Sequence, residues 1–351
     1  MTVDLLGNKD TSVPNSRSVV FICNYKQGAG GISGQVESLL CHLRKDGYTA
    51  DIFSTKGSFG ERLGLKNKFR LLVDKYDVIH VHCCSGWGFL PAVLGIRWAK
   101  RYHKRVVLTY HGGGAEKLFE RHPLFVRYYL MQSDVNVVLS GFLGIVFDKY
   151  SIPYRIIPNI IEFDDSVYHE RNPIQPRFIC IRSHERLYNI PCILRAFLRF
   201  QSQFPNASLT LVGDGSEHMA LKKKTEEMGI GNVTFTGRVD NCMIYYYLKD
   251  ADIMLSSPNV DNMPVSLLEA MNAGLLVISS NVGGVPYMID DGKTGFLFPP
   301  DDEVVLYERM SWAVTHPVEC YHVICNAKSS VKKYTWAEIK KDILQLYEWN
   351  K

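Results

Sequence analysis

The chain lacks the features of a secreted, disulfide-bonded or membrane-spanning protein. Its nine cysteines are an odd number, lie scattered and form no C-x-x-C pair, so neither a disulfide framework nor a zinc site is expected. No apolar run approaches the roughly 20 residues that span a bilayer. The opening MTVDLLGNKDTSVPNSRS does not combine a basic region with an apolar core, as a secretory signal would. We therefore expect a protein of the reducing cytoplasm.

The chain also lacks a strong charge of either sign. Its 40 Lys and Arg residues against 36 Asp and Glu residues give a net charge of +4, far from the concentrated basic surface of a nucleic-acid binder. Hydrophobic residues make up 46% and charged residues 22% of the 351 positions, as in ordinary soluble proteins. This length accommodates two domains with separate cores. Nucleic acid is therefore not an expected partner, whereas contact with an anionic membrane surface is permitted.

Short β-rich runs alternate with helical segments along both halves of the chain. The expected strands of the first half lie at residues 18–25, 48–54, 77–83, 105–111 and 135–140. Prolines and acids interrupt the pattern near residues 160–176, where we expect a linker. The expected strands of the second half lie at residues 178–183, 208–215, 233–239, 252–257 and 275–280, and residues 334–350 are expected to form a helix. This alternation predicts α/β domains whose parallel sheets are covered on both faces.

The most informative segment is SSPNVDNMPVSLLEAMNAG, residues 256–274. A buried strand leads into it, Pro264 suits a first helical residue, and Gly274 suits a C-terminal stop. Asp261 and Glu269 stand in the loop and in the helix, with seven residues between them. Free N–H groups at a helix N-terminus form an anion site, so the backbone of residues 263–266 is a candidate phosphate contact. Glu269 is then within reach of sugar hydroxyls.

This segment resembles the E-x7-E segment of the retaining nucleotide-sugar glycosyltransferases of family 4, with Asp261 in place of the first glutamate. Those enzymes have the GT-B fold, in which two Rossmann-like domains face each other across a cleft. The resemblance implies that Asp261 faces the donor sugar and that Glu269 binds the nucleotide ribose. It also implies that the backbone between them holds the diphosphate, through Met263, Pro264, Val265, Ser266 and Leu267.

Further segments match the family in the same order along the chain. Gly30 and Gly31, after the first strand, are implied to lie against the donor diphosphate, although a tight structural turn explains the pair equally well. His111 ends a strand before three glycines and is implied to lie near the donor sugar. In VTFTGRV, the resemblance places the nucleobase against Gly237, Arg238 and Val239.

Arg182 ends the strand FICIRS and matches an arginine that holds the donor phosphates in the family. A guanidinium suits bidentate phosphate contact. The lysine that follows it in the family is missing: Arg186 or Tyr188 stands near its place, with Asn189 where glycine is usual. Arg186 is the donor-binding candidate carried from this segment.

Other polar residues have structural explanations beside functional ones. His82 is a better candidate than His80 to face a cleft and to act as the base of an inverting enzyme, but a satisfied core histidine explains either residue equally well. Asp250 and Asp252 precede a buried strand, where a helix-end cap explains them better than a metal motif. No metal is expected, because GT-B enzymes generally stabilise the leaving diphosphate with helix dipoles and cations.

The stretch at residues 56–76 combines six basic residues with apolar Phe and Leu residues. The basic residues are Lys56, Arg62, Lys66, Lys68, Arg70 and Lys75. An ordinary solvated helix explains them at least as well as a surface for an anionic membrane, which relatives with lipid-linked acceptors use.

We therefore expect an α/β protein of the GT-B fold. Residues 1–165 would form the acceptor domain, with residues 335–351 packing back on it, and residues 166–334 would form the donor domain. The expected function is retaining transfer of a sugar from a nucleoside-diphosphate sugar to a glycan or lipid-linked acceptor, in bacterial surface polysaccharide or glycoconjugate synthesis. The expected location is the cytoplasm or the inner face of the cell membrane, and no cofactor is expected.

Two alternatives belong to other functional classes. A nucleotide-sugar epimerase of GT-B architecture would need acid and base residues around the sugar. A non-catalytic sugar-nucleotide binding protein would fit the missing lysine. A nicotinamide dehydrogenase is less consistent with the chain, because the glycine spacing after the first strand is not the dinucleotide fingerprint.

Overall fold

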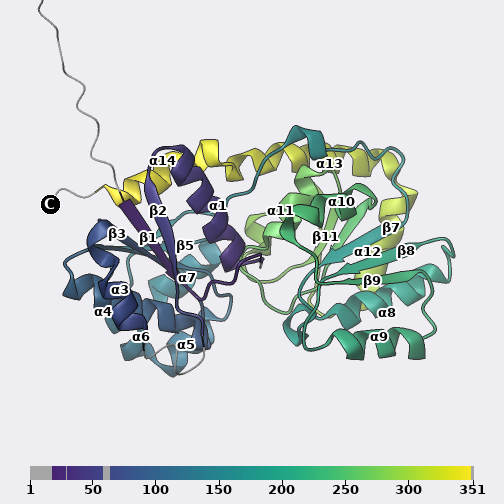
Figure 1. Cartoon of the computed structure of the whole chain (residues 1–351). Coiled ribbons are helices and arrows are strands. Elements are labelled where there is room, and N and C mark those ends of the chain that lie inside the picture. Colours follow the sequence, from purple (N-terminus) through teal and green to yellow (C-terminus); the bar gives the residue numbers. More distant parts are fainter. Residues whose placement is uncertain (1–17, 29, 58–63, 349–351) are drawn as a thin grey trace, which may run out of the picture.

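Two six-stranded sheets organise the structure, a computed structural model that describes residues 18–28, 30–57 and 64–348 (Figure 1). The first sheet has the order β2-β1-β3-β4-β5-β6 and the second the order β12-β11-β10-β7-β8-β9. The first comprises β1 Ser18–Cys23, β2 Thr49–Ser54, β3 Val78–Cys83, β4 Arg105–Tyr110, β5 Val135–Val138 and β6 Arg155–Ile156. The second comprises β7 Arg177–Ile181, β8 Ser208–Val212, β9 Val233–Gly237, β10 Ile253–Ser256, β11 Leu276–Ser280 and β12 Phe296–Phe298.

Helices cover both faces of each sheet, as parallel strands require. Around the first sheet lie α1 Ile32–Lys45, α3 Leu65–Arg70, α4 Leu90–Arg101, α5 Ala115–Arg121, α6 Pro123–Leu130 and α7 Gly141–Lys149. The second half contributes α8 Ile190–Gln201, α9 His218–Glu227, α10 Ile244–Lys249, α11 Val265–Asn272, α12 Glu303–Thr315, α13 Pro317–Val331 and α14 Trp336–Tyr347. Short 3-10 turns are η1 Val73–Lys75, η2 Gly86–Phe89, η3 Asp165–Val167, η4 Arg186–Tyr188, η5 Asn241–Met243, η6 Val285–Tyr287 and η7 Lys332–Tyr334.

Strand burial explains why this alternation folds as it does. All six residues of β1 and all six of β3 are buried. Along β1 the residues alternate between two cores: Val20 and Ile22 belong to one, whereas Val19 and Phe21 belong to the other. A strand apolar on both faces is stable only in the middle of a covered sheet. The expected α/β class is therefore confirmed.

The last helix, α14, leaves the second half and packs on the first sheet (Figure 1). Its buried residues Ile339 and Ile343 share a core with Val19 and Phe21 of β1. On the way, Ile161 N–H donates to the carbonyl of Tyr334 at 2.9 Å, so the two segments that cross between the sheets run side by side. Two chain segments that lie side by side therefore connect the two halves of the structure.

The expected linker contains a residue that ties it to the second sheet's helices. The buried Arg171 donates to the backbone carbonyls of Leu248 at 2.8 Å, Ala251 at 2.7 Å and Ala273 at 2.6 Å. Those carbonyls lie at the C-terminal ends of α10 and α11, where backbone acceptors lack helical partners and a cation is favoured. The guanidinium therefore anchors the linker to the helix whose other end faces the cleft.

Candidate active site

A cleft of about 1120 Å³ lies between the two halves, at the carboxyl edges of both sheets. Such an edge is the usual ligand site of open parallel sheets. Gly30, Gly31 and His111 line it from the first half, and Arg182 and Glu269 from the second. The structure also places Arg238, Val239, Asp261, Met263, Pro264, Val265 and Ser266 in its wall.

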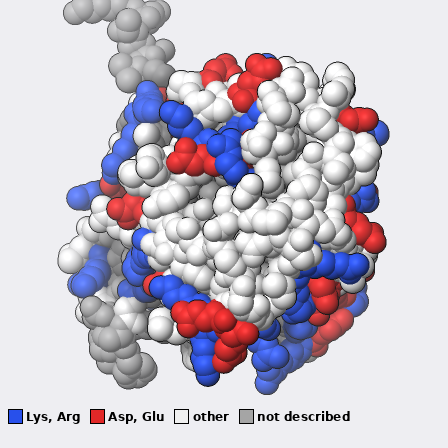
Figure 2. All heavy atoms as spheres, turned by 90° about the vertical axis from the view of Figure 1, so that its right-hand side faces the viewer, with Lys and Arg blue, Asp and Glu red and all other residues white. Residues whose placement is uncertain are grey.

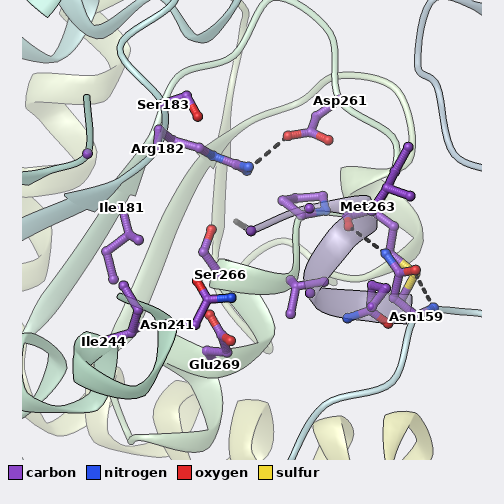
Figure 3. Close-up of a pocket in the computed structure, with 18 of the residues that line it drawn as sticks. Asn159, Ile181, Arg182, Ser183, Asn241, Ile244, Asp261, Met263, Ser266 and Glu269 are labelled. Carbon is purple, nitrogen blue, oxygen red and sulfur yellow. Dashed lines mark hydrogen bonds and ion pairs between the residues drawn. The ribbon is translucent and has the colours of Figure 1, made fainter. Parts of the chain in front are cut away.

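Arg182 and Asp261 form an ion pair inside the cleft (Figure 3). The Arg182 Nη2 and Asp261 Oδ2 atoms are 3.0 Å apart, and both side chains are largely buried. The guanidinium also lies over the ring of Tyr188, 5.1 Å from its centroid. Its Nε atom is buried and has no hydrogen-bond partner among the described residues. Arg182 therefore offers a partly unsatisfied cation to an anionic ligand.

The backbone around Asp261 is held by a glycine pair. The N–H of Gly284 donates to the Asp261 carbonyl at 3.0 Å. A Cβ added at Gly283 would overlap the Asp261 carbonyl, and one at Gly284 would overlap the carbonyl of Asn262. Gly283 also has a φ of +54°, which favours glycine. These two glycines therefore allow the acidic loop to pack directly on the turn before η6.

Asn262 and Met263 attach the acidic loop to the first half. The buried Asn262 accepts from Ser140 Oγ at 2.7 Å and donates to the carbonyl of His111 at 3.4 Å. Asn159 Nδ2 donates to the Met263 carbonyl at 3.2 Å (Figure 3). Asn159 thus lines the cleft and bridges both halves.

The first turn of α11 opens on the cleft. Pro264 is the N-cap residue rather than the first helical one, because its ψ of 106° is extended. The first turn carries no acidic residue, and the buried Ser266 Oγ has no partner among the described residues. The first turn of α1, which follows Gly31, also lacks an acid. Two helix N-termini therefore face the cleft without a negative side chain, which suits an anion.

Glu269 lies one turn further along α11, near Ser266 (Figure 3). Burial raises the pKa of Glu269 to about 7, against the lowering effect of the Arg182 charge. A carboxyl group with this pKa changes charge near neutral pH. It is therefore suited to a ligand that supplies hydrogen-bond donors to the ionised form.

Two of the histidines on β3 are buried behind the cleft wall. His82 is 2% exposed, and its Nδ1 lies 2.8 Å from Nε2 of His111, so it stands behind His111 and does not line the cleft. His80 is a satisfied core histidine, with Tyr347 and Thr109 hydroxyls each 2.8 Å from a ring nitrogen. Of the two interpretations left open, the structure has the core one for both histidines, because side chains on that face of β3 are covered by α1 and α14.

Three sequence candidates do not line the cleft. Arg186 is exposed on η4, Leu267 is buried in the core beneath α11, and Gly237 ends β9 with a φ of +69°. Tyr188, not Arg186, occupies the cleft wall beside Arg182. Arg238 reaches across the cleft, where its Nη2 lies 3.4 Å from the Gly28 carbonyl.

Several lining residues escaped sequence reasoning. Asp214 lies between two glycines directly after β8, a pattern that could have flagged it. Glu37 of α1 and the pair Asn241 and Tyr245 carry no local signal, because each is an ordinary residue in or beside a helix.

The discounted acids and the basic stretch lie elsewhere. Asp252 is buried and paired with Arg177, and Asp250 ends α10. Across the described ranges, no three His, Cys, Asp or Glu side chains gather as a metal site requires. Lys66, Lys68 and Arg70 are exposed on α3, whereas Arg62 lies outside the described residues.

The length of the helices and the distribution of surface charge bear on possible membrane contact. None of the described helices is long and apolar enough to cross a bilayer. On the face drawn in Figure 2, basic and acidic side chains are interspersed around a broad uncharged area.

Comparison with known proteins agrees with this geometry. The family model described as glycosyl transferases group 1 matches residues 164–330, and the model described as glycosyltransferase family 4 matches residues 29–165. The two matches adjoin and together cover both halves of the cleft. The chain belongs to this family of glycosyltransferases, as the motifs predicted.

Individual relatives are distant. N-acetyl-alpha-D-glucosaminyl L-malate synthase of Bacillus anthracis is 27% identical over 242 residues, which is 64% of this chain and 61% of that protein. D-rhamnosyltransferase WbpZ of Pseudomonas aeruginosa is 26% identical over 293 residues, or 79% of this chain and 74% of that one. The structure of Anabaena HepE with UDP-glucose superposes with a TM-score of 0.77 at 16% identity, over 93% of this chain and 98% of that one. The expected GT-B fold is confirmed.

Proposed function

We propose that this protein is a retaining glycosyltransferase that moves a sugar from a nucleoside-diphosphate sugar to a glycan or lipid-linked acceptor. The observation that carries the proposal is the joint position of Arg182, Asp261 and the first turn of α11 in one cleft. A cation and a helix N-terminus suit a diphosphate, and Glu269 one turn later suits a ribose diol. The complex of HepE with UDP-glucose supports this donor class.

In the proposed reaction, the bond between the anomeric carbon and the diphosphate breaks. Negative charge then builds on the leaving diphosphate, where Arg182 and the amides of the α11 first turn stabilise it. The acceptor hydroxyl attacks from the face that the phosphate leaves, and a phosphate oxygen takes its proton. Asp261, released from its ion pair once phosphate engages Arg182, is free to meet the donor sugar.

Neither a metal nor a cofactor is needed in this proposal. The positive charge that a divalent ion would supply comes from Arg182 and from two helix N-termini without acidic first turns. Transfer is therefore expected to persist in EDTA. Activity lost in EDTA and restored by Mg²⁺ or Mn²⁺ would show that carboxylates here hold a metal.

A lipid-linked acceptor is favoured by the surface of α6. Val126 and Leu130 point into the core, whereas Leu124, Tyr128 and Met131 follow at helical spacing on the outer side. Leu124 is 83% exposed and Tyr128 64% exposed. An outward apolar stripe of this kind suits the interface of a membrane. In this proposal the enzyme works on the cytoplasmic face of a bacterial cell membrane, in surface polysaccharide or glycoconjugate synthesis.

The central test pairs a donor screen with product stereochemistry. Thermal-shift measurements with UDP-, GDP- and ADP-sugars should show stabilisation by one base class. Proton NMR of the first product formed with acceptor should then show the donor's anomeric configuration. An inverted linkage would contradict the proposed retaining mechanism. A sugar altered without acceptor would indicate an epimerase, and binding with neither transfer nor hydrolysis would indicate a binding protein.

A further inference from the structure

A chain of buried aromatic and polar groups lies behind the cleft wall. His80 and His82 project from the same face of β3, with ring centroids 4.3 Å apart. The His82 ring also meets the edge of Phe21 at 5.6 Å and stacks near His111 at 5.0 Å. His80 is fixed by Tyr347 of α14, whose hydroxyl is 2.8 Å from its Nδ1. The position of the His82 ring is therefore determined from several sides.

His111 is the member of this group that reaches the cleft, and most of its polar atoms are already engaged. Its backbone N–H donates to the Cys83 carbonyl at 2.8 Å, and its backbone carbonyl accepts from the Asn262 side chain at 3.4 Å. Its Nε2 is 2.8 Å from Nδ1 of His82. Nδ1 is the polar atom of His111 that this arrangement leaves for a ligand.

The hydrogen bond between His82 Nδ1 and His111 Nε2 holds a single proton, which belongs to one of the two rings. Burial lowers the pKa of His111 to about 3 and lowers the pKa of His82 well below its ordinary value, so both rings are neutral at pH 7. Either His82 Nδ1–H donates to His111, or His111 Nε2–H donates to His82. In each arrangement His111 has a single tautomer, because its Nε2 is fixed as either acceptor or donor.

We propose that His82 is a positioning residue that holds the His111 ring in one orientation and one neutral tautomer, so that His111 Nδ1 meets the donor sugar in a defined hydrogen-bonding state. The part of this inference that concerns the sugar rests on the proposed function. The pairing of the rings does not. Residues that orient a ligand-contacting histidine commonly have a large effect on binding or activity, because a histidine in the wrong tautomer cannot make the required hydrogen bond.

The remaining nitrogen of His82 supports a positioning role rather than a catalytic one. His82 Nε2 is buried and has no hydrogen-bond partner among the described residues. His82 also lines a small cavity of about 20 Å³, whose walls include Gln35 and Asn159 from the cleft wall. That volume and those polar walls suit one water molecule, but not a sugar.

The test compares three variants of the full-length protein. His82→Leu removes the bond to His111. His82→Asn keeps a hydrogen-bonding group near the position of Nδ1. Tyr347→Phe is the matched control, since it removes a hydroxyl from the same buried chain but leaves the His82–His111 pair intact.

The first readout is the ¹⁵N chemical shifts of the His111 ring, recorded without substrate. Wild type and Tyr347→Phe should each show one protonated and one bare nitrogen, whereas His82→Leu should show two averaged nitrogens. The second readout is turnover. His82→Leu should lower kcat about tenfold to a hundredfold with little change in donor KM, and His82→Asn should recover most of that loss.

Averaged His111 nitrogens in the wild type would overturn the proposal even if His82→Leu failed to fold. So would a single tautomer retained in His82→Leu, or an Asn variant as impaired as the Leu variant. A wild-type protein that transfers no sugar would instead contradict the proposed function, while the NMR comparison would still decide whether His82 positions His111.

Discussion

We expect Glu269 to couple donor binding to pH, because its pKa is raised to about 7. An ionised carboxylate accepts hydrogen bonds from both hydroxyls of a ribose, whereas the protonated group accepts fewer. Binding that selects the ionised form strengthens as pH rises through about 7 and weakens about tenfold per unit below it. For the stability of the fold without donor, the pH dependence has the opposite sign. The folded state holds this proton more tightly than the unfolded chain, so stability falls as pH rises from 4.5 to about 7.

Calorimetry with the donor found in the screen should show this affinity profile for the wild type. Glu269→Gln should bind more weakly at high pH, by about 1.5–3 kcal/mol, and should lose the pH dependence. The diphosphate of a nucleotide sugar is a diester and does not titrate in this range, so it cannot supply the same profile. A wild-type affinity that is flat through pH 7 would contradict the ribose assignment.

Arg182 is expected to matter more for turnover than for donor binding. Its charge is needed most when the diphosphate leaves, so Arg182→Ala should lower kcat by roughly 10²–10³ and raise donor KM much less. Arg182→Lys should restore part of the rate, because an ammonium keeps the charge without the bidentate geometry. The matched control is Arg186→Ala, an exposed arginine outside the cleft that should leave kcat near wild type. The opposite ranking of the two alanine variants would transfer the phosphate role to Arg186.

At the scale of elements, local patterns predicted α11 well. Its start differs from the expected one by a single residue, and Gly274 follows its end with a φ of +83°. The strand before it, β10, is buried as expected. Apolar periodicity and end signals act over a few residues, so they are visible in one sequence.

Local sequence patterns do not show which distant segment packs against a helix or strand. The alternation of β3 predicts that His80 and His82 share a face, but not that α14, more than 250 positions later, covers it. The contact of Gly283 and Gly284 with the Asp261 loop depends on how two neighbouring strand ends meet. The cleft position of Tyr188 instead of Arg186 likewise depends on the turn η4, which Asn189 ends in a left-handed conformation.

The outward stripe of α6 predicts membrane binding. Trp87, 84% exposed on η2, lies near this helix, because Phe89 at the end of η2 contacts Phe125 with ring centroids 6.1 Å apart. Arg121 and Arg127 are exposed on and beside α6 and complement an anionic headgroup layer. We expect the protein to sediment with vesicles that contain phosphatidylglycerol and much less with pure phosphatidylcholine.

Trp87→Ser combined with Tyr128→Ser should weaken this vesicle binding at least tenfold, because aromatic side chains anchor proteins at the lipid interface. Tyr246→Ser is the control, since this tyrosine is 61% exposed on the second half of the molecule. Transfer to a water-soluble acceptor should be unchanged in all three proteins. Equal loss in the control, or a wild type that ignores anionic vesicles, would show that α6 does not meet the membrane.

At the scale of the whole molecule, the first half depends on the end of the chain. Besides its apolar contacts with β1, α14 receives a bond from Arg105 Nε to the Leu346 carbonyl at 2.7 Å. Trp336 and Lys340 bind the carboxylate of Asp46, which follows α1, at 3.0 and 2.8 Å. The second sheet has its own helices, and among the described residues its two cores contain none from α14.

Removal of residues 335–351 should therefore unfold the first half selectively. Four side chains, Ile339, Ile343, Leu346 and Tyr347, leave its core, and each stabilises the fold by roughly 1.5–3 kcal/mol. The sum is comparable to the whole stability of an ordinary domain, roughly 5–15 kcal/mol. Limited proteolysis should then cut the first half early and spare a fragment near residues 170–334, and donor stabilisation should be lost because the cleft lacks one wall. As a control, Lys341→Ala, a change on the exposed face of α14, should change neither the proteolysis pattern nor the melting temperature. A shortened chain that resists proteolysis like the full-length protein would show that the first sheet is stable without α14.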